Sequence, residues 1–320
     1  MISIKSSVVK IDEIDLQDHT FKISTDKDLA CLTESIQHLG LITPPLLFQK
    51  ESGYILVSGF RRIAACKNLK FVRINAGILD DALGPLDCAQ IAIAENSFQR
   101  ELNLVEISRA LNLLEHFIKK ESKIGNVTKL LNLPENPSLI KKIKKIHRLS
   151  DSMQDGILYN RISMDMALKL DSLGENEGSV FLKIFNELSL SRNKQKELLS
   201  HIEEISIRDD IAIAQLLKSK DVQEILTNRD FDRTQKTKYL RDFLKKRRYP
   251  HLYFSEKQFF DSLKKIKLGN RMSLKPADYF EGNSFTMQIS FKDLKELGLH
   301  LKTLNQIKKN PLLKDLLDRK

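Results

Sequence analysis

The hydrophobic pattern of this chain changes at about residue 103, and the change limits the folds available to it. Before that point, short apolar runs with strand character alternate with segments of helical spacing. After it, nearly every apolar stripe repeats at three to four residues, as in helices. With 320 residues the chain is too long for one ordinary core. The pattern predicts an α+β protein, mainly helical, that begins with a small mixed α/β domain.

The first hundred residues are expected to form this α/β domain. Segments with strand character are residues 8–14, 45–49, 54–58 and 71–79. Segments with helical spacing are residues 28–39, 60–68 and 87–98. In the first helix, four residues share the face expected to pack inward: Leu29, Leu32, Ile36 and Leu39. Gly40 follows that helix as its stop signal.

An all-α helix-turn-helix domain is predicted after residue 103. Asn103, with Glu106 three residues later, is a capping-box start for a first helix. Residues 127–133 have the pattern of a short helix. Asn136 and Pro137 then start a longer helix, which is expected to run to about residue 149. These lengths and the turn between them are typical of a DNA-binding helix-turn-helix.

The rest of the chain is expected to form a helical C-terminal region. Its start is predicted at residues 174–178, with the sequence Gly-Glu-Asn-Glu-Gly. A basic stretch at residues 236–248 is either another DNA contact or a basic linker. Oligomerisation or partner binding is the interpretation of the region as a whole. The domains predicted are residues 1–103, 104–175 and 176–320.

A small β hairpin and a helix are predicted to close the C-terminal region. Apolar and polar side chains alternate over residues 285–291, which predicts a half-buried strand. Its partner is expected at residues 272–274 or 278–280, across a turn at Gly282-Asn283. Residues 293–307 have helical spacing. The side chains expected to face inward there are Leu294, Leu297, Leu301 and Leu304.

The net charge of +11 at pH 7 favours a polyanionic partner, nucleic acid before an anionic membrane. No stretch has the apolar length of a membrane span and no signal peptide is visible, so a cytosolic protein is expected. Cys31, Cys66 and Cys88 are scattered, so no Cys/His metal site is predicted. Their apolar neighbours predict small buried side chains in a reducing compartment.

A phosphate site is one of two interpretations of Gly59-Phe60-Arg61-Arg62. The motif follows the strand at 54–58 directly and opens a helix. A glycine there lets a ligand approach the backbone, the helix start offers free N–H groups, and two guanidinium groups suit phosphate oxygens. The alternative is a tight turn with solvated arginines, and the spacing alone does not exclude it.

Polar side chains from Glu95 to Arg100 close the last helix of the same domain. The Glu95 carboxylate can hold Mg²⁺ beside phosphates. Asn96, Gln99 and Arg100 can complete an anion site. Taken alone, this stretch is better explained as an ordinary polar helix end.

Basic residues concentrate on the predicted helix-turn-helix. Residues 117–150 contain nine lysines and arginines against two glutamates. On an uninterrupted second helix, one face carries Lys141, Lys144, Lys145 and Arg148, with Lys142 beside them. A solvated lysine face is the alternative. The concentration of charge favours DNA, contacted mainly through its phosphates.

Taken in order, these motifs resemble the ParB family of DNA-partition proteins. Residues 39–44 resemble the family's Gly-Leu-Ile-Gln-Pro box, and residues 59–62 its Gly-Glu-Arg-Arg box. Residues 95–106 resemble the box that begins Glu-Asn-Ile-Gln-Arg, and residues 149–168 resemble the segment after the family's helix-turn-helix. The similarity spans residues 1–175.

The resemblance implies a CTP-gated DNA-binding protein for plasmid or chromosome partition. Family members bind CTP with Mg²⁺ in the N-terminal domain, many hydrolyse it slowly, and the nucleotide closes a homodimeric clamp on double-stranded DNA. A nucleoid-associated cytoplasmic location and a ParA-type ATPase partner are also implied. The nucleotide-binding candidates are Thr43, Gly59, Arg61, Arg62, Asn96 and Arg100, with Glu95 as metal ligand and Glu95 and Asn96 as catalytic residues. The DNA-binding candidates are Lys141, Lys142, Lys144, Lys145 and Arg148.

The chain departs from the family pattern in four places. Phe60 replaces a glutamate, Thr43 a glutamine and Val105 a proline. Arg100 lies one place late, with Gln99 in the usual position of the arginine. One residue turns a helical side chain by about 100°, so CTP binding is expected, and any CTPase activity is expected to be weak.

Two other classes of function stay open. A transcription regulator of the same fold, without an active nucleotide site, is the main alternative. An enzyme, either a nuclease or a relative of sulfiredoxin, is the third hypothesis. A nuclease needs clustered carboxylates, and only Glu95 is placed near the loop. The redox enzyme needs a cysteine in the loop, whereas Cys66 lies a helical turn beyond it.

Overall fold

The computed structural model of the chain describes residues 3–25, 29–118, 127–266, 268, 271–277, 282 and 284–317. Contacts between residues divide the chain into two compact units, residues 1–182 and 183–320. The division falls inside helix α9 (Glu175–Leu188). The domain boundaries expected near residues 103 and 175 stay predictions.

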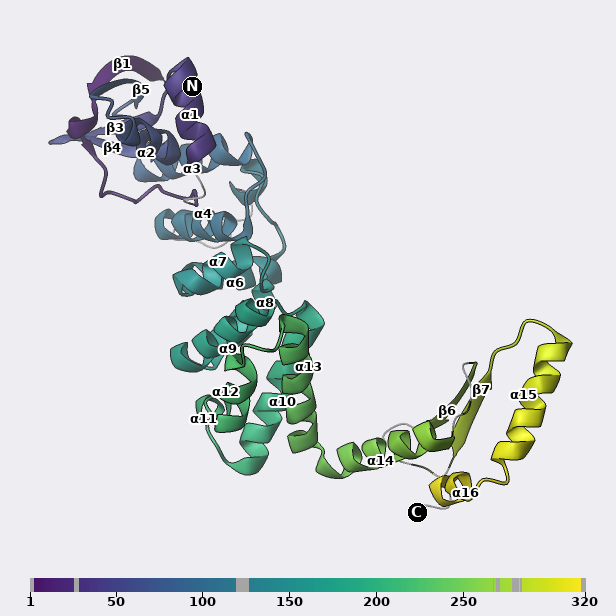
Figure 1. Cartoon of the computed structure of the whole chain (residues 1–320). Coiled ribbons are helices and arrows are strands. Elements are labelled where there is room, and N and C mark those ends of the chain that lie inside the picture. Colours follow the sequence, from purple (N-terminus) through teal and green to yellow (C-terminus); the bar gives the residue numbers. More distant parts are fainter. Residues whose placement is uncertain are drawn as a thin grey trace. The chain divides into compact units, whose positions relative to one another are not determined.

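A five-stranded mixed sheet lies at the centre of the first hundred residues (Figure 1). Its strands are β1 (Ile4–Lys10), β2 (Ile14–Asp15), β3 (Leu46–Lys50), β4 (Gly53–Ser58) and β5 (Arg73–Leu79), in the order β1-β5-β3-β4-β2. β1 is antiparallel to β5 and β3 to β4, whereas β3–β5 and β2–β4 are parallel. The strand predicted at 8–14 has the wrong bounds, because a 3₁₀ turn (Ile11–Glu13) interrupts it.

Helices cover both faces of this sheet. α1 (Ala30–Leu39) and α2 (Phe60–Asn68) pack on one face, where Ile63 joins Leu47 in a buried cluster. α3 (Pro85–Ser97) packs on the other face. The buried residues on that second face are Phe21, Ile55, Val57, Leu79, Cys88, Ala89 and Ala92.

Two residues that were expected to be buried in α1 are exposed. Leu39 is 69% exposed, because it occupies the last position of the helix and Gly40 turns the chain there with a φ of +76°. Cys31 is exposed in the first turn. Cys66 and Cys88 are buried as predicted, and burial raises the pKa of both thiols, that of Cys88 to about 11.

Most of the described residues between 104 and the end of the first unit are helical. The elements are α4 (Leu104–Phe117), a helical turn at 127–130, α6 (Pro137–Lys144), α7 (Asp151–Leu158), α8 (Met164–Ser172) and the start of α9. The predicted capping box is present: Oδ1 of Asn103 accepts from the N–H of Glu106, whose carboxylate accepts from the Asn103 N–H. Asn136 caps α6 as predicted, since its Oδ1 accepts from the Leu139 N–H at 3.1 Å.

The second helix of the expected helix-turn-helix is shorter than predicted. α6 ends at Lys144 and continues as a 3₁₀ helix, η2 (Lys145–Arg148). Side chains of α4 stabilise this change: Ser108 Oγ and Asn112 Nδ2 donate to the Lys144 carbonyl at 3.3 and 3.0 Å. Ser108 Oγ also accepts from the His147 N–H at 2.9 Å. These bonds replace the backbone bonds that would have continued an α-helix.

Helices also make up most of the second unit. They are α10 (Arg192–Asp209), α11 (Ile213–Leu217), α12 (Lys220–Thr227), α13 (Arg233–Arg248), α14 (Pro250–Ile266), α15 (Leu294–Ile307) and α16 (Pro311–Leu317). The basic stretch 236–248 lies on α13, so it is not a linker. Arg241 donates to both carboxylate oxygens of Glu197 on α10, and Arg247 pairs with Asp209 at 3.0 Å. Much of its charge is therefore neutralised within the unit.

The predicted hairpin is present near the C-terminal end. β6 (Met272–Pro276) pairs antiparallel with β7 (Phe285–Ile289), with Met272 opposite Ile289. The other candidate partner, 278–280, and Asn283 of the turn lie outside the described residues. Leu294 and Leu301 are 83% and 51% exposed and do not face inward as predicted. The predicted fold class, α+β and mainly helical, is confirmed.

Candidate functional site

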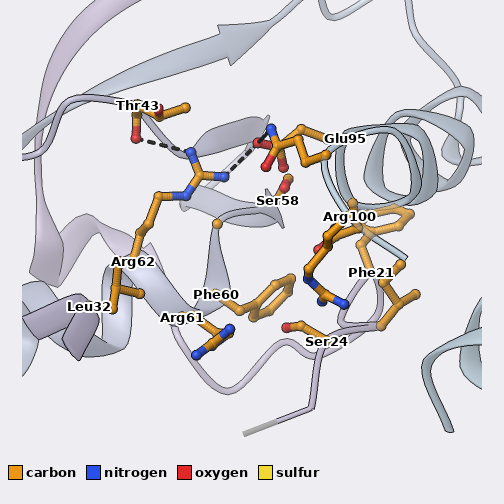
Figure 2. A pocket seen from close by; sticks show the side chains of 14 residues that line it. Phe21, Ser24, Leu32, Thr43, Ser58, Phe60, Arg61, Arg62, Glu95 and Arg100 are labelled. Carbon is orange, nitrogen blue, oxygen red and sulfur yellow. Dashed lines mark hydrogen bonds and ion pairs between the residues drawn. The ribbon is translucent and has the colours of Figure 1, made fainter. Parts of the chain in front are cut away.

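A pocket lies where β4 ends and α2 begins, against the C-terminal end of α3 (Figure 2). Every residue predicted for nucleotide or metal lines it: Thr43, Gly59, Arg61, Arg62, Glu95, Asn96 and Arg100. The pocket is also lined by Phe21, Ile23, Ser24, Leu32, Ser58, Phe60 and Gln99. The fold therefore brings three separate motifs of the sequence to one place.

Gly59 is required for two reasons at the start of α2. Its φ of +96° lies in the left-handed region that favours glycine. A Cβ on this residue would also lie 2.8 Å from Cβ of Pro45. The space left by the missing side chain is thus occupied by Pro45. The approach of a ligand to the Gly59 backbone stays a prediction. The first turn of α2 has no side-chain cap, and its residues Phe60, Arg61 and Arg62 line the pocket. Uncapped N–H groups at a helix start suit an anion.

Ser58 is a pocket residue that sequence reasoning missed. It is only 2% exposed, and its Oγ has no hydrogen-bond partner among the described residues. A buried hydroxyl without a partner costs free energy, on the order of 1–3 kcal/mol, so this atom favours a polar ligand. The available signal in the sequence was a serine that ends an apolar strand directly before Gly59.

Arg62 holds the walls of the pocket together. Its Nη1 donates to the carbonyls of Thr43 and Pro44, both at 3.0 Å, and its Nη2 donates to Oε1 of Glu95 at 2.6 Å. Both charged side chains are 17% exposed. Figure 2 shows Arg61 and Arg62 leaving the start of α2 in different directions, with Arg62 directed toward Thr43 and Glu95. The two adjacent arginines therefore have different surroundings.

Glu95 and Asn96 lie together on the last turns of α3. Oε1 of Glu95 also accepts from Nε2 of Gln99 at 3.4 Å, and Nδ2 of Asn96 donates to the Ala92 carbonyl at 2.8 Å. Within the described residues, no group of three or more His, Cys, Asp or Glu side chains is placed to hold a metal. A Mg²⁺ ion at Glu95 would therefore need ligand oxygens, such as phosphates, to complete its coordination.

Arg100 is directed to a carboxylate of α4. Its Nη1 and Nη2 donate to the two oxygens of Glu106 at 2.6 and 2.8 Å. Burial raises the pKa of Glu106, but hydrogen bonds from Arg100 and from the Thr25 N–H outweigh it, so the pKa lies below its usual value. The displacement by one residue noted in the sequence thus corresponds to a bidentate ion pair with a residue outside the pocket lining.

The predicted DNA-binding residues lie on α6 and η2. Lys141, Lys142, Lys145 and Arg148 are exposed, whereas Lys144 is half-buried and its Nζ pairs with Glu115 of α4. The predicted exposed basic face therefore does not include Lys144. Lys145 and Arg148 are three residues apart in a 3₁₀ helix, a spacing that places them on the same side.

The basic side chains of α6 and η2 differ in whether a carboxylate neutralises them. Lys142 pairs with Asp165 at 3.1 Å, with both side chains more than half exposed. In the described part of the chain, Lys141, Lys145 and Arg148 have no ion-pair partner. Three uncompensated cations on α6 and η2 suit a polyanion.

The sheet domain and most of the pocket residues lie in a part of the chain that matches a known domain family. Residues 3–97 belong to the ParB N-terminal domain family. Over a longer stretch, the chain is a distant homologue of chromosome-partitioning ParB proteins. The family resemblance seen in the sequence motifs is thereby confirmed.

Two relatives define the extent of this homology. The probable chromosome-partitioning protein ParB of Helicobacter pylori is 25% identical over 178 residues, which cover 55% of this chain and 59% of that protein. The corresponding protein of Campylobacter jejuni is 31% identical over 142 residues, 40% of this chain and 50% of that protein. The chain thus spans 50–59% of the length of these two relatives.

Solved structures that match part of the chain include two of C-terminally truncated ParB from Caulobacter crescentus. One is complexed with CTP-γ-S (18% identity, TM-score 0.27, 57% of this chain and 98% of that one). The other is complexed to the centromeric parS site (18% identity, TM-score 0.34, 59% and 96%). A pNOB8-like ParB N-domain is 15% identical with a TM-score of 0.35, over 77% of this chain and 92% of that one.

Proposed function

We propose that this chain is a ParB-like partition protein that binds DNA through α6 and η2 and is gated by a nucleotide in the pocket. The observation that carries the proposal is the convergence of residues 43, 59–62, 95–96 and 99–100 on one pocket, together with the uncapped start of α2 and the buried Ser58 hydroxyl in its lining. Such an arrangement suits a phosphate chain.

CTP with Mg²⁺ is the proposed ligand. The N–H groups at the start of α2 and the Arg61 guanidinium would bind phosphates, and Thr43 would lie toward the base. Glu95 and Asn96 would hold the Mg²⁺, which neutralises phosphate charge when bound. The pocket supports binding more strongly than turnover, because Glu95 is engaged by Arg62 and Arg100 by Glu106. Any CTPase activity would accordingly be weak.

Double-stranded DNA is the proposed macromolecular partner. Lys141, Lys145 and Arg148 would contact phosphates, with Lys142 beside them once its exposed pair with Asp165 opens. Lys144 would contribute less directly, through the position it holds against Glu115. A homodimer, a ParA-type ATPase partner and a nucleoid-associated place in the cytoplasm complete the proposal.

Calorimetry tests the nucleotide part of this proposal. CTP, ATP and GTP, each with Mg²⁺, are titrated into the full chain, into Arg61→Ala and into Arg73→Ala, an exposed arginine on β5 away from the pocket. We expect heat with CTP in the wild type and in Arg73→Ala, and loss of most of it in Arg61→Ala. No heat with any nucleotide would instead favour a transcription regulator of the same fold.

A further inference from the structure

The ion pair between Arg100 and Glu106 joins the pocket to α4. Arg100 lines the pocket and 39% of its side chain is exposed, whereas the Glu106 side chain is 2% exposed in the first turn of α4. Two charge-assisted hydrogen bonds, at 2.6 and 2.8 Å, connect them. The guanidinium is therefore accessible from the pocket, while its partner is not.

Glu106 also binds the segment next to the pocket wall. Its Oε1 accepts from the Thr25 N–H at 3.0 Å and from the Thr25 hydroxyl at 3.3 Å. Ser24, the residue before, lines the pocket, and its carbonyl accepts from Nη1 of Arg109 on α4 at 2.8 Å. One carboxylate thus contacts the Thr25 backbone, the helix start at Asn103 and the guanidinium of Arg100.

An anion in the pocket and the Glu106 carboxylate would compete for the Arg100 guanidinium. Withdrawing Arg100 would leave a buried carboxylate without its counter-ion, which is strongly unfavourable. Three neutral donors, from Thr25 and Asn103, would remain on Glu106 and partly offset that loss. The ion pair is therefore costly to open, yet it does not hold Glu106 alone.

We infer that Glu106 is a positioning residue that sets the anion affinity of the pocket by competing with the ligand for Arg100. The inference rests on the proposed function, because it takes the ligand to be a phosphate chain. Arg100, which lies one place late in the motif, then completes the anion site only when its guanidinium leaves Glu106.

The competition can be measured with sodium tripolyphosphate in Mg²⁺-free buffer, by calorimetry on the full chain. In Glu106→Gln the amide oxygen still accepts from the Thr25 N–H, but the negative charge that holds Arg100 is gone. We expect this variant to bind tripolyphosphate on the order of tenfold more tightly than the wild type, the size of one charge-assisted hydrogen bond. Glu101→Gln, an exposed neighbour with the same change of charge, is the matched control and should bind like the wild type.

The double variant Arg100→Gln/Glu106→Gln separates competition from a general change in the pocket. It replaces the ion pair with an amide pair of similar size, and we expect its affinity to fall several-fold below that of the wild type, because position 100 no longer carries a cation for the anion. Equal affinity of the double variant and Glu106→Gln would overturn the inference. If Glu106→Gln does not fold, the double variant is compared with the wild type: a several-fold weaker affinity supports the inference, and an unchanged affinity overturns it.

The same titrations distinguish this inference from the proposed function. Binding of tripolyphosphate and CTP by the wild type, with no effect of any of these substitutions, would remove only the role of Glu106. Absence of binding in the wild type and in Glu106→Gln would remove the phosphate site itself, and the inference with it.

Discussion

Nη2 of Arg62 lies 2.6 Å from Oε1 of Glu95, so an ion pair joins the start of α2 to the end of α3 across the pocket. The same guanidinium donates to the carbonyls of Thr43 and Pro44. One side chain therefore connects three segments that are distant in the sequence. Arg62 therefore determines the shape of the pocket as well as contributing to the charge of the pocket.

Replacing Arg62 should destabilise the first unit. Arg62→Ala leaves Glu95 and two carbonyls without their donor, and we expect a loss of about 2–4 kcal/mol in the free energy of unfolding, measured by urea denaturation. Glu95→Gln should cost less, about 1 kcal/mol, because the amide oxygen still accepts from Arg62. Arg73→Ala, at an exposed arginine, serves as control. An equal loss of stability in Arg62→Ala and Arg73→Ala would show that the Arg62 contacts do not stabilise the first unit.

A side chain at position 59 should be poorly tolerated. Gly59→Ala combines an unfavourable positive φ with the contact to Pro45, and we expect a loss of about 2–4 kcal/mol. Gly174 has a similar φ of +98° but nothing within 4 Å of an added Cβ. Gly174→Ala should therefore cost only about 1–2 kcal/mol by the same urea measurement. Equal losses in the two variants would show that the Pro45 contact is unimportant.

DNA affinity should depend steeply on salt, through the cations of α6 and η2. If about six phosphates are neutralised, affinity for duplex DNA falls on the order of 10³-fold between 50 and 200 mM salt. The triple variant Lys141→Ala/Lys145→Ala/Arg148→Ala should reduce the slope of log K against log salt by roughly 3. The slope is obtained from fluorescence anisotropy titrations at several salt concentrations.

Two single variants provide the controls for that experiment. Lys144→Ala should change the slope less than Lys145→Ala, because Lys144 is paired with Glu115. Lys220→Ala, an exposed lysine of α12, should leave the slope unchanged. A triple variant with the wild-type slope would rule out α6 and η2 as the DNA surface.

The three cysteines should differ in reactivity toward a thiol reagent. At pH 8 we expect Cys31 to react fast and Cys66 and Cys88 only on unfolding, as followed by the absorbance of released thionitrobenzoate. Cys31→Ser should remove the fast phase, and a second fast thiol would contradict the observed burial.

The raised pKa values also predict how stability changes at high pH. The buried Cys88 thiol has a pKa of about 11 against 9.0 for the ordinary thiol, so the unfolded chain loses this proton first. Its contribution to stability is fully present below pH 9 and is lost as the pH rises from about 9 to about 11. Urea denaturation at pH 8 and pH 10 measures the loss, and Cys88→Ala should reduce it.

Local structure was largely predictable from the sequence by itself. α2 has the bounds that the pattern predicted, and the caps at Asn103 and Asn136 are present. These features depend on residues three or four positions apart, and such neighbours are in contact whenever the segment is helical. The motifs that line the pocket were recognised through their resemblance to the ParB family, because each box is a short local sequence.

The partners of the charged side chains were decided only by the tertiary structure. Arg61 and Arg62 are equivalent in the sequence, yet Arg62 binds Glu95, 33 residues away. Lys144 belongs to the predicted DNA face, yet it pairs with Glu115, and contacts from α4 end its helix there. The long side chains of lysine and arginine bind whichever carboxylate or carbonyl the fold brings near. The periodicity of one segment does not show which carboxylates or carbonyls of another segment will lie beside it.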